Sequence, residues 1–369
     1  MYLSKLYGCV IASDVDLHQA PLAEGPSPDV TLRQADDEWD PGWKPEPADV
    51  ISNYWNEPIQ QGYVSARIAE GYRLRLHDYC EYDLNRELDC ATWRVAPNPE
   101  SWVVATVAVG AFMTLRLMLQ GDLVLHSSAV TVGGRGLAFV GMSGMGKSTM
   151  ASLLCHAGAL HVTDDVGRVL FAKDGVKLAS GGHESRLRTT AAPVADLMPE
   201  VGTRRTDDGR LALSLARTPA ETVPLDAVVI PLPTRDRTEL TLHTRSPAET
   251  VLLLNGFPRL AGLQDPAMLD RQFHQLVDLA ERVPVFTAAI PWGPTYQPAV
   301  ATELIRQLGW GPPARLSAVL VDERADDRQY LGDMPYGTPV ELLANLRSTA
   351  PSAATRIGAT PCASTPRPS

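Results

Sequence analysis

One short stretch of the chain, residues 141–148, reads GMSGMGKS and matches the pattern GxxxxGK[ST]. The residues before it, GLAFV, predict a strand, and the residues after it, STMASLLCHAG, predict a helix that ends near Gly158. A strand, a glycine turn and a helix in this order are typical of an α/β domain that holds its ligand at the ends of strands. This motif constrains the fold class more than any other part of the chain.

The glycine turn also predicts a phosphate site. Glycines allow successive backbone N–H groups to point into one concavity, and the helix N-terminus adds positive potential. Lys147 is expected to reach the β- and γ-phosphates, and the Ser148 hydroxyl to ligate Mg²⁺. The expected ligand is therefore ATP with Mg²⁺, although a loop that holds only phosphates does not distinguish ATP from GTP. The predicted binding residues are Gly141, Ser143, Gly144, Met145, Gly146, Lys147, Ser148 and Thr149.

Two aspartates follow the next predicted strand, in the segment LHVTDDV, 17 and 18 residues after Lys147. An acidic residue at a strand end is the usual Mg²⁺ partner of a phosphate loop. Because successive side chains on a strand point to opposite faces, one of Asp164 and Asp165 is expected to face the metal and the other a second reactant. Such a pair suits a kinase, in which one carboxylate accepts the proton of an attacking hydroxyl. A solvated turn is the alternative interpretation.

A histidine and several arginines complete the candidate site. His126, in VLHSSAV, lies 21 residues before Lys147, and is either a packed, hydrogen-bonded residue or a contact of the γ-phosphate or an aspartate. Guanidinium groups suit phosphate and carboxylate recognition, although surface arginines are common. The candidate arginines are Arg186, Arg188, Arg204 and Arg205.

The 369 residues predict two or three domains. Residues 1–98 contain short runs of β-forming residues between polar turns, which predicts a small β-rich N-terminal domain. Residues 99–310 carry the strand and helix patterns of the α/β domain, beginning with a buried helix over 101–120. Residues 311–348 form a C-terminal extension, and residues 349–369 have too few apolar side chains to pack, so a disordered tail is expected there.

Composition excludes some classes of binding partner and indicates the cellular compartment. The formal net charge of −10 argues against a broad nucleic-acid-binding surface. Five cysteines without CxxC spacing argue against a disulfide scaffold and a cysteine-rich zinc site. The N-terminus lacks the apolar core of a signal peptide, and the apolar run from Trp102 to Leu115 is shorter than a membrane span. We expect a cytoplasmic protein without a nucleic-acid or membrane partner, and the oligomeric state stays open.

Taken together, the segments LHSSAV, GMSGMGKST and TDD resemble the HPr kinase superfamily. The serine inside the loop, Ser143, and the short interval from Lys147 to the two aspartates carry this resemblance. The chain is more closely similar to the HPr-kinase-like proteins encoded with lasso-peptide biosynthesis genes, through YGCVIASDVDL near the N-terminus and HESRL around Arg186. The resemblance covers roughly residues 2–295. It implies a P-loop kinase domain of the HPr-kinase/PEP-carboxykinase-like type.

The resemblance also implies a reaction, ATP- and Mg²⁺-dependent phosphorylation of a hydroxyl. In the lasso-associated group the acceptor is the C-terminal serine of a precursor peptide. By position, Asp164 would be the general base, Ser148 with Asp165 the metal site, and His126 a supporting catalytic residue. Lys147 would clamp the phosphates. Glu184 is a candidate replacement for the metal-binding glutamate of the HPr kinases.

Two other functions agree with the same residues. One is a kinase of a small hydroxylated metabolite, which would need no peptide. The other is a nucleotide-binding module that hydrolyses ATP slowly or not at all. The second carboxylate of the Asp164–Asp165 pair argues against a pure binding module, because binding alone does not need it. The first hypothesis therefore remains a serine kinase acting on a peptide or protein.

Overall fold

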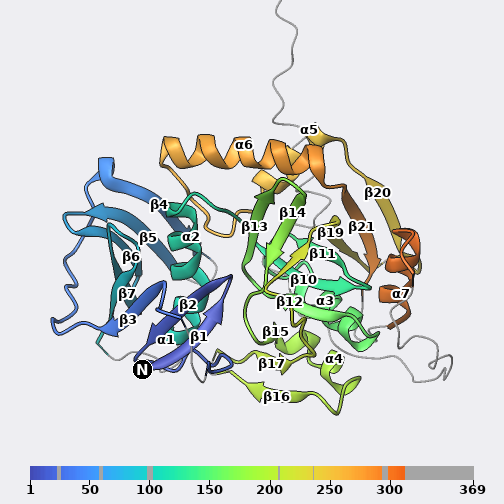
Figure 1. Ribbon diagram of the computed structural model, residues 1–369, viewed down its shortest axis with the longest axis horizontal. Coiled ribbons are helices and arrows are strands. Elements are labelled where there is room, and N and C mark those ends of the chain that lie inside the picture. Colours follow the sequence, from blue (N-terminus) through green and yellow to red (C-terminus); the bar gives the residue numbers. More distant parts are fainter. Residues whose placement is uncertain are drawn as a thin grey trace, which may run out of the picture. The chain divides into compact units, whose positions relative to one another are not determined.

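The computed structural model describes residues 1–22, 26–57, 61–97, 103–206, 208–235, 237–292 and 298–311 (Figure 1). These residues belong to one unit that spans Met1–Arg328. Within the described ranges the chain forms four sheets and several helices, so the predicted mixed α/β class is confirmed. Apart from Gly311, the expected extension and tail, residues 311–348 and 349–369, lie outside the described residues.

The N-terminal part forms an eight-stranded sheet in the order β1-β2-β3-β8-β7-β6-β5-β4. Alternating apolar residues place one face of this sheet on a hydrophobic cluster. Its strands are β1 (Tyr2–Leu6), β2 (Cys9–Ser13), β3 (Val30–Gln34), β4 (Val50–Asn56), β5 (Gln61–Ile68), β6 (Gly71–Leu76), β7 (Cys80–Asn85) and β8 (Cys90–Val95), with the 3₁₀ turn η1 (Pro47–Asp49) before β4.

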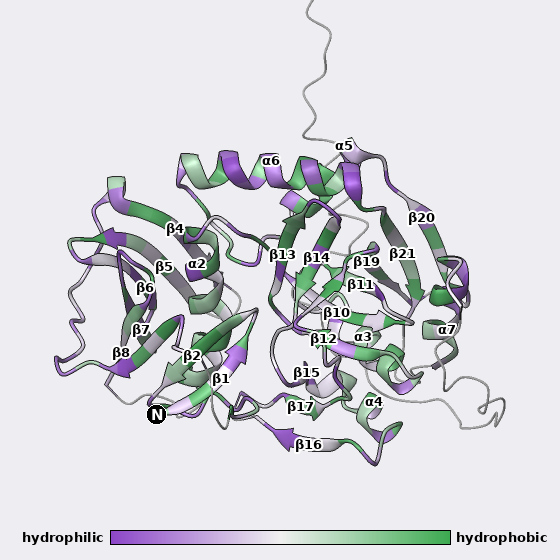
Figure 2. Ribbon diagram, in the orientation of Figure 1, coloured by the Kyte–Doolittle hydropathy of each residue, from purple (hydrophilic) through white to green (hydrophobic). Residues whose placement is uncertain are grey.

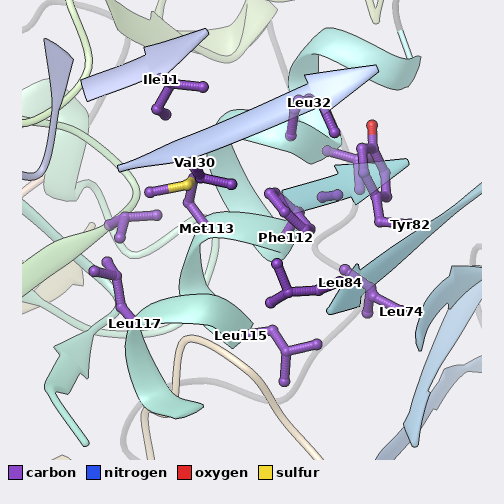
Figure 3. Close-up of a cluster of buried hydrophobic side chains, with 14 of the residues drawn as sticks. Ile11, Val30, Leu32, Leu74, Tyr82, Leu84, Phe112, Met113, Leu115 and Leu117 are labelled. Atoms are coloured by element: carbon purple, nitrogen blue, oxygen red, sulfur yellow. The ribbon is translucent and has the colours of Figure 1, made fainter. Parts of the chain in front are cut away.

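A buried helical segment packs against this sheet, as the apolar run predicts. It consists of α1 (Val103–Val107), the π-helical turn η3 (Ala108–Phe112) and α2 (Met113–Leu119). Figure 3 shows Phe112 and Met113 among strand residues such as Tyr82, whose ring lies 5.0 Å from that of Phe112 between centroids. The sequence pattern did not predict the π-helical turn, which widens the helix beside the candidate site.

The glycine loop belongs to a six-stranded sheet in the order β12-β10-β11-β19-β21-β20. The predicted hairpin is confirmed, since β10 and β11 are joined at Gly133 and Gly134, which have φ of +58° and +85°. Strands β11, β19 and β21 run parallel, so their carboxyl ends meet at one edge. The strands are β10 (Ser127–Val132), β11 (Arg135–Val140), β12 (Leu160–Thr163), β19 (Ala227–Thr234), β20 (Thr241–Thr244) and β21 (Val285–Pro291).

Three of the helices pack on this sheet through a second hydrophobic cluster, to which they contribute Leu153, Val194 and Leu304. The predicted capping box of Ser246 and Glu249 is present at the start of α5. Helix α6 carries both polar and apolar residues along its length (Figure 2). Among the described residues, no helix is long and apolar enough to cross a membrane. The helices are α3 (Lys147–His156), α4 (Pro193–Asp196), α5 (Pro247–Asn255), α6 (Pro266–Arg282) and α7 (Pro298–Gln307), with the 3₁₀ turn η4 (Thr189–Ala191).

Two smaller sheets flank the glycine loop and the aspartate pair. The first has the order β18-β14-β13-β9 and the second the order β15-β17-β16. Their strands are β9 (Leu123–Leu125), β13 (Gly167–Ala172), β14 (Gly175–Ala179), β15 (Ser185–Leu187), β16 (Gly202–Arg205), β17 (Leu211–Ser214) and β18 (Thr222–Pro224).

Candidate functional site

The glycine-rich loop joins β11 to α3. Gly144 and Gly146 have φ of +90° and +85°, a region that other L-residues rarely adopt, and Gly146 directly precedes the helix. Thr149 is buried in the first turn of α3. The first backbone N–H groups of a ten-residue helix therefore lie beside the turn, where they favour an anion.

Lys147 is folded back onto the loop that precedes it. Its Nζ donates to the carbonyl oxygens of Gly141 at 2.9 Å and Met142 at 3.0 Å, and the side chain is buried. Burial lowers the pKa of Lys147 to about 8, against the opposing effect of Asp165 and Asp164. The Lys147 ammonium group is thus held inside the loop, and it loses its proton at a lower pH than an exposed lysine does.

This placement predicts that nucleotide binding is linked to protonation of Lys147. Phosphate oxygens favour the cation and raise its pKa, so binding will take up a proton near pH 8, and affinity for ATP will fall as the pH rises above that value. Calorimetry at about pH 8.5 in buffers of different ionisation enthalpy will measure the uptake. Lys147→Arg stays charged and will show none; equal uptake by this variant would contradict the assignment to Lys147.

Asp164 follows β12 and lies directly under the first turn of α3. Its Oδ1 accepts hydrogen bonds from the hydroxyls of Ser148 (2.8 Å) and Ser128, and its Oδ2 accepts one from the Arg186 backbone N–H at 2.8 Å. The carboxylate is buried and held on both oxygens. A hydroxyl and a carboxylate are the hard oxygen ligands that Mg²⁺ prefers, so Ser148 and Asp164 fit this ion.

Asp165 has different surroundings. Its φ of +72° takes it out of the extended conformation, so the predicted strand alternation is wrong here: both aspartates lie in a bend after β12. Its carboxylate lies 2.6 Å from Arg259 Nη2, 3.3 Å from His126 Nε2 and 3.7 Å from Arg186 Nη2. Burial alone would raise the pKa of Asp165, but these partners outweigh it and hold the pKa well below its usual value.

His126 links Asp165 to the start of the glycine loop. It lies between β9 and β10, and its carbonyl oxygen accepts a hydrogen bond from the Gly141 N–H at 3.4 Å. Burial and the neighbouring Lys147 lower the pKa of His126 to about 4, so the imidazole is neutral at neutral pH. A neutral ring that contacts a carboxylate orients it without cancelling its charge.

The predicted arginines separate into two groups. In the three-stranded sheet Arg186 and Arg204 both face Ala212 across β17, which places them on one face of that sheet, whereas Arg205 pairs with Leu211 and lies on the other face. The structure therefore does not bring Arg205 to the site. Arg204 and Arg205 are adjacent in β16, and adjacent residues of a strand point to opposite faces of the sheet.

The remaining residues of this region also find partners. Arg204 Nη2 donates to Glu184 Oε2 at 2.7 Å, so Glu184 forms an ion pair in this structure. Arg188 Nη2 donates to the Ser143 hydroxyl at 2.8 Å and reaches the middle of the glycine loop. Positive charge is therefore present at the loop as well as at Asp165.

Arg259 is a site residue that no sequence pattern predicted. It lies in the segment after α5, 94 residues beyond Asp165. A Cβ atom at Gly110 in the π-helical turn would lie 2.8 Å from Arg259 Nη2 and 3.5 Å from Asp165 Oδ2, so glycine leaves room for this ion pair. No local motif marks Arg259, because the contact depends on how two distant segments fold.

An open pocket lies over the two aspartates. Asp164, Asp165, Arg186 and Arg204 line one part of it. The turn between β1 and β2 and the segment after β2 line another part, through Tyr7, Leu17, His18 and Gln19, and α1 with η3 contributes a third. The pocket therefore gives a second molecule access to Asp165, whose side chain is 26% exposed, and borders the buried Asp164.

The turn between β1 and β2 fixes the N-terminal contribution to this pocket. Tyr7 has φ of +54° and its hydroxyl donates to the Val109 carbonyl at 2.9 Å. Its backbone N–H donates to the Ser180 carbonyl at 2.8 Å, and its own carbonyl accepts from Arg168 Nη1 at 2.8 Å. The turn is thus bonded to three segments distant in the sequence.

The described residues contain no group of three or more His, Cys, Asp and Glu side chains arranged to hold a metal ion.

Comparisons with known proteins add little at the level of sequence. No family model matches the chain, and no curated protein matches it. Among solved structures, the chain is similar to the Hpr(Ser) kinase/phosphatase from Coxiella burnetii, at 12% sequence identity and a TM-score of 0.28, over 50% of this chain and 90% of that chain.

Proposed function

We propose that this protein is an ATP- and Mg²⁺-dependent kinase that phosphorylates a serine hydroxyl on a peptide or protein. One observation carries the proposal: two adjacent carboxylates with separate partners lie beside the glycine loop and line one open pocket. A nucleotide-binding module needs the loop and one carboxylate. The second carboxylate, Asp165, supplies a function that binding alone does not require.

The two aspartates have different roles in this proposal. Asp164 shares a hydrogen bond with Ser148, and the described residues show no such bond between Ser148 and Asp165. We therefore assign Ser148 and Asp164 to Mg²⁺ and Asp165 to the acceptor hydroxyl, which exchanges the roles that position alone suggested. Bound Mg²⁺ would neutralise charge on the phosphates.

Asp165 receives the hydroxyl of the acceptor as a hydrogen-bond donor and directs its oxygen at the γ-phosphorus. A new O–P bond forms as the bond to the β,γ-bridging oxygen breaks, and the hydroxyl proton passes to Asp165. The products are a phosphoester and ADP. Lys147 and Arg186 stabilise the charge that spreads over the phosphoryl oxygens, and His126 holds Asp165 in position.

Arg204, on the same face as Arg186, supports an acceptor that carries a carboxylate close to its hydroxyl. Both guanidinium groups lie on the pocket face of the three-stranded sheet. A C-terminal serine has such a carboxylate, and Arg204 would exchange its Glu184 partner for it. Together with the resemblance to the lasso-associated proteins, this leads to the C-terminal serine of a lasso precursor peptide as the proposed acceptor.

Phosphate transfer to matched peptides tests this proposal. The full chain is incubated with ATP and Mg²⁺ and a peptide that ends in Ser, and mass spectrometry is expected to find a gain of one phosphate. The same peptide ending in Ala, or ending in Ser with an amidated carboxyl group, is expected to gain none. Phosphorylation of small hydroxylated compounds without any peptide would favour a metabolite kinase, and nucleotide binding without any transfer would favour a binding module.

A further inference from the structure

The indole of Trp292 lies against the glycine loop from outside the pocket. A Cβ atom at Gly146 would lie 2.4 Å from Trp292 Cη2 and 2.9 Å from its Cζ3, so the ring occupies the space that any other side chain at residue 146 would need. The Trp292 backbone N–H donates to the Thr234 carbonyl at 2.8 Å, which anchors the residue to the end of β19. Gly146 of the glycine loop thus lies in close contact with the indole of Trp292, whose backbone is held at the end of β19.

The order of strands in the sheet indicates whether the phosphate end or the nucleoside end of a bound nucleotide would lie near Trp292. Strands β10 and β12 lie on one side of β11, and β12 leads into Asp164 and Asp165; β19 and β21 lie on the other side, and β21 leads into Trp292. The phosphate that is transferred must lie by the aspartates. A triphosphate that follows the loop from there leaves its nucleoside on the side of β19 and β21.

We infer that Trp292 is the platform on which the purine ring of the nucleotide stacks, an inference that rests on the proposed function. The indole is half-buried: it packs on the hydrophobic cluster that includes residues of α3, and one edge of the ring meets the loop at Gly146. Every purine has a π-face, and an aromatic side chain binds it without reading its edges. This site therefore contributes affinity for the base, which the phosphate loop cannot supply.

The test compares ATP with inorganic tripolyphosphate, which has the phosphates without the base, both with Mg²⁺ and the full chain in a calorimeter. Trp292→Ala is expected to weaken ATP binding roughly tenfold or more and to leave tripolyphosphate binding within about twofold. Trp292→Phe is expected to keep most of the ATP affinity. Trp55→Ala, at an exposed tryptophan of β4, is the matched control and will change neither affinity.

Three results separate the possibilities. Equal weakening of both ligands by Trp292→Ala would show that the ring only supports the loop, and unchanged ATP affinity would also overturn the inference. Wild-type protein that binds neither ligand would instead refute the proposed function. If Trp292→Ala does not fold, ATP must still quench tryptophan fluorescence in the wild type and lose that quenching in Trp292→Phe; quenching that persists would overturn the platform.

Discussion

Asp165→Asn is expected to lower the rate of phosphate transfer about 10³-fold or more while leaving ATP affinity within about threefold. The amide keeps the size of the carboxylate but cannot accept the proton of the acceptor hydroxyl. In the part of the chain that the structure describes, Ser148 donates its hydrogen bond to Asp164, so the proposed Mg²⁺ ligands stay in place. Single-turnover kinetics with the Ser-terminal peptide, together with calorimetry for ATP, will measure the two effects separately.

Asp164→Asn is the matched variant one residue away. Since Asp164 accepts from Ser148 and Ser128, this change is expected to remove the dependence of ATP affinity on Mg²⁺. If Asp164→Asn instead loses transfer with its Mg²⁺-dependent binding intact, and Asp165→Asn remains active, the exchange of roles inferred from the structure is wrong. The assignment by position alone would then stand.

Arg259→Gln is expected to raise the pKa of Asp165. As the pH is lowered, the variant is therefore expected to lose phosphate transfer at a higher pH than the wild type does. The Arg259 guanidinium is the strongest of the partners that hold this pKa down. Without it, proton uptake by the carboxylate begins nearer neutrality, so the acidic limb of the pH–rate profile will move up by about one unit or more. Because both limbs lie at acidic pH, rates measured from about pH 3 to 7 will show the shift.

The same variant will lose stability in a pH-dependent way. A depressed carboxyl pKa contributes stability that is present above the unfolded value of about 4 and is lost as the pH falls through the folded value. Because Asp165 keeps His126 and is 26% exposed, we expect a loss of about 2 kcal/mol at pH 7 that shrinks at lower pH. Arg188→Gln removes the same charge without touching Asp165 and is the control. An equal shift in that variant would contradict a specific role for Arg259.

Local patterns predicted much of the fold around the glycine loop. The hairpin at Gly133 and Gly134, the helix from Lys147 and the cap at Ser246 each depend on residues close in sequence, so glycine turns, helical spacing and a capping box were sufficient to find them. The π-helical turn at Gly110 has no such signature. Gly110 in this turn leaves room for Arg259 beside Asp165, a contact between segments far apart in the sequence.

The candidate site was less predictable than the fold. The pair Asp164–Asp165 is visible in the sequence, but the contacts that separate their surroundings come from Ser148 on one side and Arg259 on the other. The alternation of side chains along a strand did not predict where the two carboxylates point, because Asp165 has a left-handed backbone conformation and does not continue the strand. The face of Arg205 follows only from the register of its strand, which a single sequence does not reveal.

The turn at Tyr7 has a consequence for anyone who wishes to isolate a smaller active fragment. Cutting the chain at residue 98 would strip Arg168 and Ser180 of their Tyr7 partners and remove one wall of the pocket. Such a fragment would keep the phosphate loop and both aspartates but would lack the N-terminal side of the pocket over them. A shortened chain for the transfer assay must therefore retain the first hairpin, even though no residue of that hairpin belongs to the phosphate-binding motif.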